Sequence, residues 1–144
     1  MWRRVVLTDR RKEGVSCDAS CDEDELRLSF STVYEFAMEM PLDEIRFILE
    51  TADLNRKAAE ASLKGNFGHT VSKTVSGVYG RKYMGDSAYT HMLAMTAAAC
   101  DARMDGAMIP VMSNSGSGNQ GIAATLPVLS FSEDIECSEE QLIR

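Results

Sequence analysis

Nine consecutive residues, 113–121, contain no apolar side chain and form the segment best suited to bind a ligand. Its glycines allow positive φ angles and a close approach to a ligand, and its other side chains offer neutral hydrogen-bonding groups. The apolar run 122–129 that follows must be buried, so free backbone N–H groups at the rim would suit a carboxylate or phosphate. We therefore expect an anion-binding loop. Its residues are Ser113, Asn114, Ser115, Gly116, Ser117, Gly118, Asn119, Gln120 and Gly121.

The glycines of this loop also match Gly-x-Gly-x-x-Gly over residues 116–121, the dinucleotide-binding fingerprint. That fingerprint follows a buried parallel strand, whereas Pro110 interrupts the preceding segment and removes a donor that such a strand needs. A nucleotide-binding domain is therefore only an alternative. A surface turn without function is a second alternative, which the apolar flanks 108–112 and 122–129 disfavour.

A further polar residue, Asn55, falls on the inward face of a predicted helix. It continues the apolar series Ile45, Ile48 and Ala52 by another three residues. A buried amide needs hydrogen-bond partners. Two interpretations stay open, a hydrogen bond between two helices and a contact with a bound polar ligand.

The cysteines do not form a metal-binding pattern. Cys17 and Cys21 have no further partner at a suitable spacing, and Cys100 lies on the apolar face of a predicted helix, where we interpret it as a core thiol. A zinc site that adds His69 and His91 is disfavoured because these histidines are 22 residues apart. The fourth cysteine, Cys137, lies in an acidic tail. We expect no metal site in this chain.

The elements that must position the loop are predicted to be helices. Ser31 or Thr32 can cap a short helix that ends before Pro41. A longer helix runs over 42–64, where apolar residues recur at helical spacing and Gly65 stops the run.

A third predicted helix leads toward the loop. Asp86 or Ser87 can cap it, and its alanines allow close packing. It delivers Asp101 and Arg103 at its C-terminal end. One face of this helix consists of Tyr89, Met92, Leu93, Thr96 and Cys100.

The first 30 residues differ from the rest of the chain. Residues 5–8 and 26–30 are short β-type runs, and the segment between them is polar, which indicates a hairpin or a connecting arm. We therefore predict a β-type arm over 1–30 and a helical domain over 31–144. The fold class is mainly α, with a small β element at the N-terminus.

Composition excludes several classes of partner. The chain has 144 residues, 44% of them apolar and 26% charged, an ordinary globular balance. Its formal net charge of -7 opposes nucleic-acid binding. No apolar stretch approaches the roughly 18 residues of a membrane span, and the N-terminus does not have a signal-peptide pattern. We expect a cytoplasmic protein with reduced thiols.

The sequence resembles the bacterial and archaeal L-cysteine desulfidase family, which is related to the iron-sulfur L-serine dehydratases through their α-type catalytic domain. The resemblance covers roughly 28–144 and matches the first 27 residues poorly. A weaker part of the similarity lies earlier in the chain, at Pro41-Leu42, 45–49, Leu54-Asn55, Gly65 and Gly68. It rests mainly on residues 101–104, Pro110 and 113–121, with Ile122, Ala124, Thr125 and Pro127.

The resemblance implies an α,β-elimination that is independent of pyridoxal phosphate. Such an enzyme converts L-cysteine to pyruvate, ammonia and sulfide, or L-serine to pyruvate and ammonia, with a [4Fe-4S] cluster. The cluster's ligands in the family lie outside the part that this chain resembles, so we expect none of them here. By the same resemblance, loop 113–121 would hold the substrate carboxylate. Arg103 would be a second anion partner, with Asp101 and Asn55 as further candidates.

The chain is thus expected to be a piece of a helical catalytic domain whose partners are a small amino acid and the missing parts of its own polypeptide. Apolar surface left by those missing parts would favour self-association into a homo-oligomer. The alternative is a truncated, non-catalytic homologue that binds a small carboxylate or serves only in assembly.

Overall fold

A computed structural model describes residues 29–144. Within this range the regular elements are helices, which confirms the mainly α fold class, apart from an isolated bridge between Asn114 and Ser117. The predicted arm of residues 1–30 lies outside the described residues, except for its last two. The helices are α1 (Phe30–Glu39), α2 (Leu42–Ile45), α3 (Ile48–Lys64), α4 (Val71–Ser76), α5 (Val78–Met84), α6 (Ala88–Met104), α7 (Gly118–Asp134) and α8 (Glu139–Ile143).

The first helix begins earlier than predicted. Its N-cap is Ser29, whose hydroxyl accepts a hydrogen bond from the Thr32 amide at 3.2 Å, rather than Ser31 or Thr32 itself. The helix ends before Pro41, as expected. Ser29 therefore satisfies a helix-end amide that no residue within α1 can reach.

The helix predicted over 42–64 is interrupted. Residues 46 and 47 separate α2 from α3, and the amides of Leu49 and Glu50 bond to carbonyls three residues back rather than four. Such tighter bonds mark a 3₁₀-type turn that breaks the α-helical pattern. Gly65 ends α3 as predicted, with its amide bonded to the Ala61 carbonyl at 2.8 Å.

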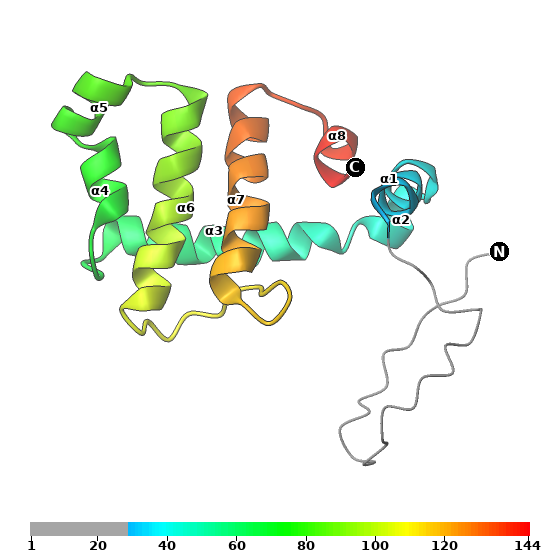
Figure 1. The fold of residues 1–144 in the computed structure, drawn as a ribbon, viewed down its shortest axis with the longest axis horizontal. Helices are drawn as coiled ribbons and strands as arrows, with labels where there is room; N and C mark the ends of the chain where they lie inside the picture. Colours follow the sequence, from blue (N-terminus) through cyan, green and yellow to red (C-terminus); the bar gives the residue numbers. More distant parts are fainter. Residues whose placement is uncertain (1–28) are drawn as a thin grey trace, which may run out of the picture.

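The core lies where α3 crosses α6 and α7, which stand side by side (Figure 1). The apolar face expected on α6 contributes little to the core, because Tyr89 is exposed and Met92, Leu93 and Thr96 are half-buried, whereas Cys100 is half-buried and packs against the core cluster. Alanines form the buried face instead, because their small side chains let helix backbones approach closely. The core cluster consists of Ala58, Ala59, Ala98, Ala99, Ile122, Leu126 and Leu129.

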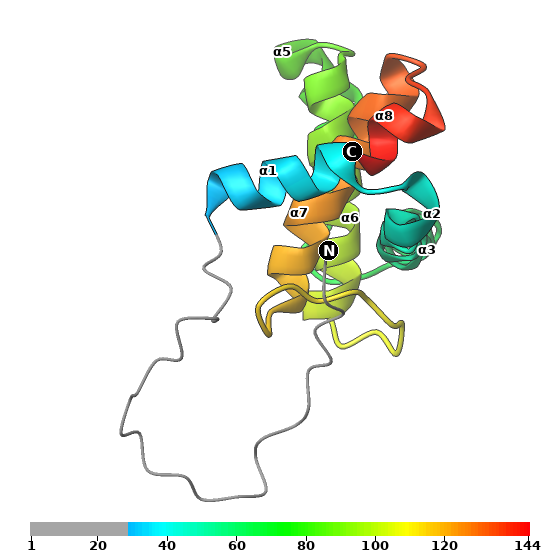
Figure 2. The same cartoon turned by 90° about the vertical axis from the view of Figure 1, so that its right-hand side faces the viewer.

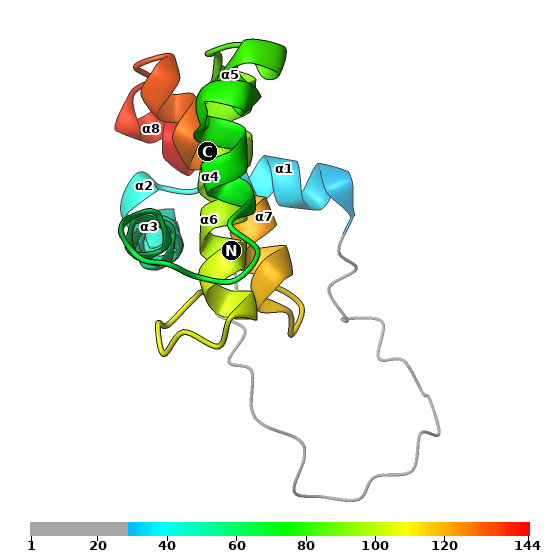
Figure 3. The ribbon, with the colours of Figure 1, turned by 90° about the vertical axis from the view of Figure 1, so that its left-hand side faces the viewer.

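Short helices flank this core. α4 lies beside α6, as seen with α3 viewed end-on in Figure 3. α1 projects away from the α6–α7 pair (Figure 2), and it has no buried residue. The Arg144 guanidinium donates hydrogen bonds to the carbonyls of Ala37 and Met38 at 2.6 and 2.8 Å, which ties the end of α1 to α8. None of the helices in the described part is long and apolar enough to cross a membrane.

Candidate functional site

The polar loop 113–121 consists of two structurally different halves. The first half is an exposed turn, in which Asn114 and Ser117 exchange backbone hydrogen bonds of 3.1 and 2.9 Å. Both central residues have positive φ, 50° for Ser115 and 78° for Gly116, as a type I′ turn requires. Ser115 holds a conformation that non-glycine residues rarely adopt, and its hydroxyl bonds to Asn114 Oδ1 at 3.1 Å.

The second half of the loop is the first turn of α7. Ser117 is the N-cap, and its hydroxyl accepts a hydrogen bond from the Gln120 amide at 3.4 Å. The amides of Gly118 and Asn119 have no acceptor among residues 29–144 and are thus the free donors of this helix end. No β-strand precedes the turn in the described part of the chain, so the dinucleotide-binding arrangement is not formed here.

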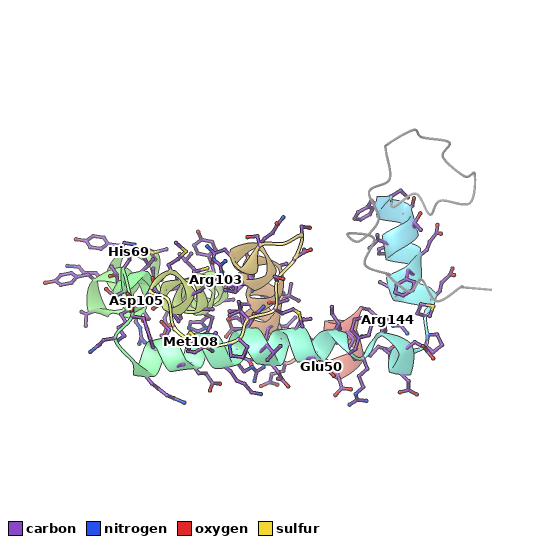
Figure 4. All side chains as sticks on the ribbon, turned by 90° about the horizontal axis from the view of Figure 1, so that it is seen from below. Glu50, His69, Arg103, Asp105, Met108 and Arg144 are labelled. Atoms are coloured by element: carbon purple, nitrogen blue, oxygen red, sulfur yellow. The ribbon has the colours of Figure 1, made fainter. Side chains whose placement is uncertain are left out.

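Arg103 crosses the start of α7. Its Nη1 donates a hydrogen bond to Asn119 Oδ1 at 3.0 Å, and its side chain lies so close to Gly118 that a Cβ there would be 2.4 Å from Arg103 Nε. Figure 4 shows the labelled Arg103 between the ends of α6 and α7. A guanidinium and a helix N-terminus, both of which favour anions, therefore meet at one point.

Two glycines of the loop are required for different reasons from those expected. Within the loop the glycine with positive φ is Gly116, whereas Gly118 is constrained by the Arg103 side chain. At Gly121 a Cβ would lie 2.0 Å from the Met112 carbonyl oxygen. The backbone entering the loop therefore packs directly on the first turn of α7.

Asn55 has the structural role that the sequence left open. The side chain is fully buried, at 0% exposure. Its Nδ2 donates to Thr125 Oγ1 of α7 at 2.7 Å, and its Oδ1 accepts from the Met112 amide at 2.9 Å. The hydrogen bond between helices is thus present, and a second one reaches the residue just before the loop.

Asp101 is directed to a different element from the predicted loop. Its carboxylate is buried, and Oδ2 accepts two hydrogen bonds of 3.0 Å, from the amide and the hydroxyl of Ser72. Asp101 therefore fastens the start of α4 to α6. Arg103, two residues later on the same helix, is the one that reaches the loop.

A cavity of about 430 Å³ opens beside the loop, between α3, α7 and α8. Apolar side chains form most of its wall, and Thr51, Ser113, Asn114 and Thr125 contribute polar groups. Sequence reasoning missed the contribution of α3 and α8. The spacing of Thr125, four residues after Gly121, could have indicated that both face this side of α7. The lining residues are Ile48, Leu49, Thr51, Ala52, Met112, Ser113, Asn114, Gly121, Ala124, Thr125, Val128, Leu129 and Leu142.

The described thiols do not form a ligand set for an iron-sulfur cluster. Cys100 and Cys137 are free and half-buried, and residues 29–144 contain no group of three His, Cys, Asp or Glu side chains that could hold a metal ion. Burial raises the pKa of the Cys100 thiol, and the neighbouring Asp101 carboxylate adds to this rise. A raised pKa disfavours the thiolate that binds metals. Cys17 and Cys21 lie outside the described residues.

A histidine between two carboxylates lies near the start of α6. His91 Nδ1 contacts both carboxylate oxygens of Asp134 at 3.0 and 3.1 Å, and Nε2 contacts Asp86 Oδ1 at 2.9 Å. The hydrogen bonds to Asp134 and then Asp86 raise the pKa of His91. α6 has 17 residues and is thus about 25 Å long, so this cluster lies far from the loop.

Similar proteins place this arrangement in a family. The chain is 81% identical over 139 residues to a UPF0597 protein of Parabacteroides distasonis, a match that covers 96% of this chain and 32% of that protein. UPF0597 proteins of Porphyromonas gingivalis and Aeromonas hydrophila are 60% and 40% identical over 96% and 98% of the chain, and 33% and 34% of their own lengths. The chain therefore spans about a third of the length of the curated relatives it matches.

No solved structure matches the chain significantly. Residues 8–144 match the serine dehydratase alpha chain, a family that the polar loop and the preceding Asp-Ala-Arg-Met segment had already suggested. This match extends over nearly the whole chain. The chain therefore belongs to the serine dehydratase alpha chain family.

Proposed function

We propose that this chain is the substrate-carboxylate-binding part of a cytoplasmic amino-acid lyase of the L-serine dehydratase or L-cysteine desulfidase type. The reaction is an α,β-elimination without pyridoxal phosphate. A base removes the Cα proton, the Cβ–O or Cβ–S bond breaks with loss of water or sulfide, and the resulting enamine isomerises to an imine that water hydrolyses to pyruvate and ammonia. Family membership supports the lyase class.

The observation that carries the proposal is the convergence of positive charge at the start of α7. The free amides of Gly118 and Asn119 lie at the positive end of a 17-residue helix, next to the Arg103 guanidinium. An amino-acid carboxylate bound here would accept charge-assisted hydrogen bonds from the amides and from Arg103. Asn119 already bonds to Arg103, so its amide side chain keeps the guanidinium at the helix end.

The [4Fe-4S] cluster of the proposed enzyme would need ligands beyond residues 29–144, because Cys100 and Cys137 have no set of partner ligands there. We assign it to the part of the full-length polypeptide that this chain does not span, and assign no reaction step through the thiols of this chain. The role proposed for this chain is to bind and orient the substrate.

The test uses a chimaera in which this chain replaces the matching segment of the Parabacteroides distasonis relative, reconstituted without oxygen. We expect pyruvate from L-serine, from L-cysteine or from both, with sulfide in the second case. Loss of a hydrogen bond to a charged group costs about 1.5–3 kcal/mol, so Arg103→Gln should lower kcat/KM about 10- to 100-fold. Lys57→Gln, which removes an exposed charge from α3, is the matched control and should not change kcat/KM.

A chimaera that releases no pyruvate from either amino acid would contradict the lyase proposal. A lyase in which Arg103→Gln and Lys57→Gln behave alike would contradict the carboxylate site alone. Gly118→Ala adds an independent check, because a Cβ at this position must displace the Arg103 side chain without removing its charge. It should lower kcat/KM in the same direction as Arg103→Gln.

A second candidate function is a non-catalytic module that binds a small carboxylate. It is favoured by one observation, namely that the anion-binding groups lie within residues 101–121 while the described chain lacks a ligand set for the cluster. Calorimetric titration of the isolated chain with L-serine separates the candidates. Binding by the isolated chain, together with an inactive chimaera, would favour this module over the lyase.

A further inference from the structure

We propose that Asn55 is a positioning residue for the anion-binding loop, which deepens the proposed function and rests on it. Asn55 belongs to α3 and is separated in sequence from its two hydrogen-bond partners by 57 and 70 residues. Because it is fully buried, it cannot be a freely accessible ligand contact in this structure. Its amide instead determines where both ends of the loop lie.

The contacts around Asn55 close into a ring. Asn55 Oδ1 accepts from the Met112 amide, and the Met112 carbonyl packs against the Cα of Gly121, where no Cβ would fit. The Gly121 carbonyl accepts from Thr125 Oγ1 at 3.0 Å, and that same hydroxyl accepts from Asn55 Nδ2 at 2.7 Å. Met112 directly precedes the loop and Gly121 ends it, so the ring holds the two ends of the loop together.

The chemistry of this ring requires a side chain that both donates and accepts. Asparagine provides an amide donor for Thr125 and a carbonyl acceptor for Met112 in one planar group. Aspartate would keep the acceptor but lose the donor, and leucine would leave the amide of the half-buried Met112 without its partner. Glutamine would place the same groups one methylene further from α3, so the two hydrogen bonds could not both keep their present geometry.

The ring constrains the anion-binding half of the loop, whereas the turn lies outside it. Gly118 and Asn119 lie between the fixed Gly121 and the Ser117 cap, so their amides keep one direction. Ser115 and Gly116 lie outside the ring and are exposed. A carboxylate bound at the helix start would therefore depend on Asn55 without touching it.

The first arm of the test measures geometry in this chain without any substrate. Amide hydrogen exchange is compared between the wild type and Asn55→Ala, Thr125→Val and Thr125→Ser. Removing the ring should speed exchange at Met112 and over 118–121 by about ten-fold or more in Asn55→Ala, and less in Thr125→Val. Thr125→Ser keeps the hydroxyl and should restore the wild-type rates. Ser62→Ala, at another buried position of α3, is the control and should leave these amides unchanged.

The second arm measures kinetics in the chimaera. If the loop binds the carboxylate equally in the ground and transition states, Asn55→Ala should raise KM about ten-fold, while kcat should stay within about three-fold of the wild-type value. Thr125→Val should raise KM less, and Thr125→Ser should restore it. A merely structural role would instead lower the amount of folded enzyme without changing KM.

The two arms separate the inference from the proposed function. Unchanged exchange at Met112 and 118–121 in both Asn55→Ala and Thr125→Val overturns the inference while leaving the lyase proposal intact. Altered exchange with an unchanged KM in an active chimaera also overturns it. An inactive wild-type chimaera overturns the proposed function, and the catalytic significance of the ring falls with it.

Discussion

The centre of the molecule and its flanks use side chains in opposite ways. Where α3 crosses α6 and α7, the buried residues are mostly alanines, and Ile122 and Leu126 are the largest fully buried apolar side chains. On α1 and α5 the large side chains face outward, with Phe30, Tyr79 and Tyr83 exposed to 87%, 76% and 80%. The small residues are inside and the aromatic ones outside.

In the centre, small side chains allow the helix backbones to approach closely. On the flanks, exposed aromatic side chains provide apolar surface that another part of a protein can cover. Small side chains let α3, α6 and α7 come close enough for Asn55 and the Gly121–Met112 contact to hold the loop. Large exposed apolar patches mark interaction surfaces. The chain spans about a third of its relatives' length, so we propose that other parts of the family polypeptide cover the flanks.

The largest effect is expected from adding a Cβ atom at Gly121, where the backbone of Met112 approaches most closely. Gly121→Ala places a carbon 2.0 Å from the Met112 carbonyl oxygen, so the backbone itself must move. We expect a loss of about 3 kcal/mol or more in unfolding free energy, at the upper end of overpacking costs. Gly116→Ala is the matched control, because its Cβ meets no atom within 4 Å and only its φ of 78° opposes the substitution. It should cost about 1–2 kcal/mol.

Urea unfolding of both variants measures the difference. Equal losses for Gly121→Ala and Gly116→Ala would mean that the backbone contact of Gly121 contributes nothing beyond ordinary glycine effects. The close packing of the centre would then have to be abandoned as an explanation for how the loop is held.

The second prediction concerns the alanine core itself. Ala98 is fully buried in the centre, whereas Ala123 is exposed on α7. Ala98→Leu should therefore lower the unfolding free energy by about 2 kcal/mol through overpacking, and Ala123→Leu should change it by less than about 0.5 kcal/mol. Thermal unfolding of the pair measures this, and a well-tolerated Ala98→Leu would show a loosely packed centre.

Sequence patterns identified where helices begin and end better than they identified which side of a helix is buried. Gly65 and Ser87 were read correctly as a helix stop and a helix cap, because their effects depend on neighbours only a few residues away. The apolar face expected on α6 is not its buried face, because an alanine-rich helix has apolar residues on all sides and its buried apolar residues are alanines. Which face is buried depends on how closely α3 and α7 approach, and no local pattern encodes that.

The candidate site shows the same limit. The polar loop was evident from composition, and its second half is the helix start that the anion argument required. The partners of Asn55 and the contact of Gly121 join residues far apart in sequence, so only the fold reveals them. Asp101 and Arg103 were both candidates for the site, but a two-residue step on a helix turns them toward different neighbours. The role of the loop in substrate binding stays a prediction.

The third prediction concerns the exposed apolar side chains of α5 and their part in self-association. Val78 and Tyr83 of α5 are 83% and 80% exposed, so replacing both with glutamate should change the unfolding free energy by less than about 0.5 kcal/mol per site. The isolated chain should self-associate through such apolar surface, and the double variant should do so less. Sedimentation velocity over a range of concentrations measures this. A wild-type chain that stays monomeric at high concentration would contradict the view of the flank as a contact surface.

The smallest effect is expected at the histidine that joins α6 to α7 at the edge of the centre. His91 on α6 bonds to Asp134 on α7 and to Asp86 before α6, and these bonds raise its pKa above the usual 6.5. The charged groups that face this cluster are Asp134, Asp86 and Arg81. The hydrogen bond from His91, and then the charge of Arg81, lower the pKa of the Asp86 carboxyl below 3.8. The protonated ring therefore stabilises the fold fully below about pH 6.5, and this contribution is lost as the pH rises through the raised pKa.

His91→Gln should lower the melting temperature at about pH 5.5 and have no effect at about pH 9, while the carboxylates stay ionised at both values. Exposure of the pair limits the size of the effect. His69→Gln, a change at an exposed histidine without an ion pair among residues 29–144, is the matched control substitution. A His91→Gln melting temperature that differs from the wild type equally at both pH values would show that the ring acts through packing rather than charge.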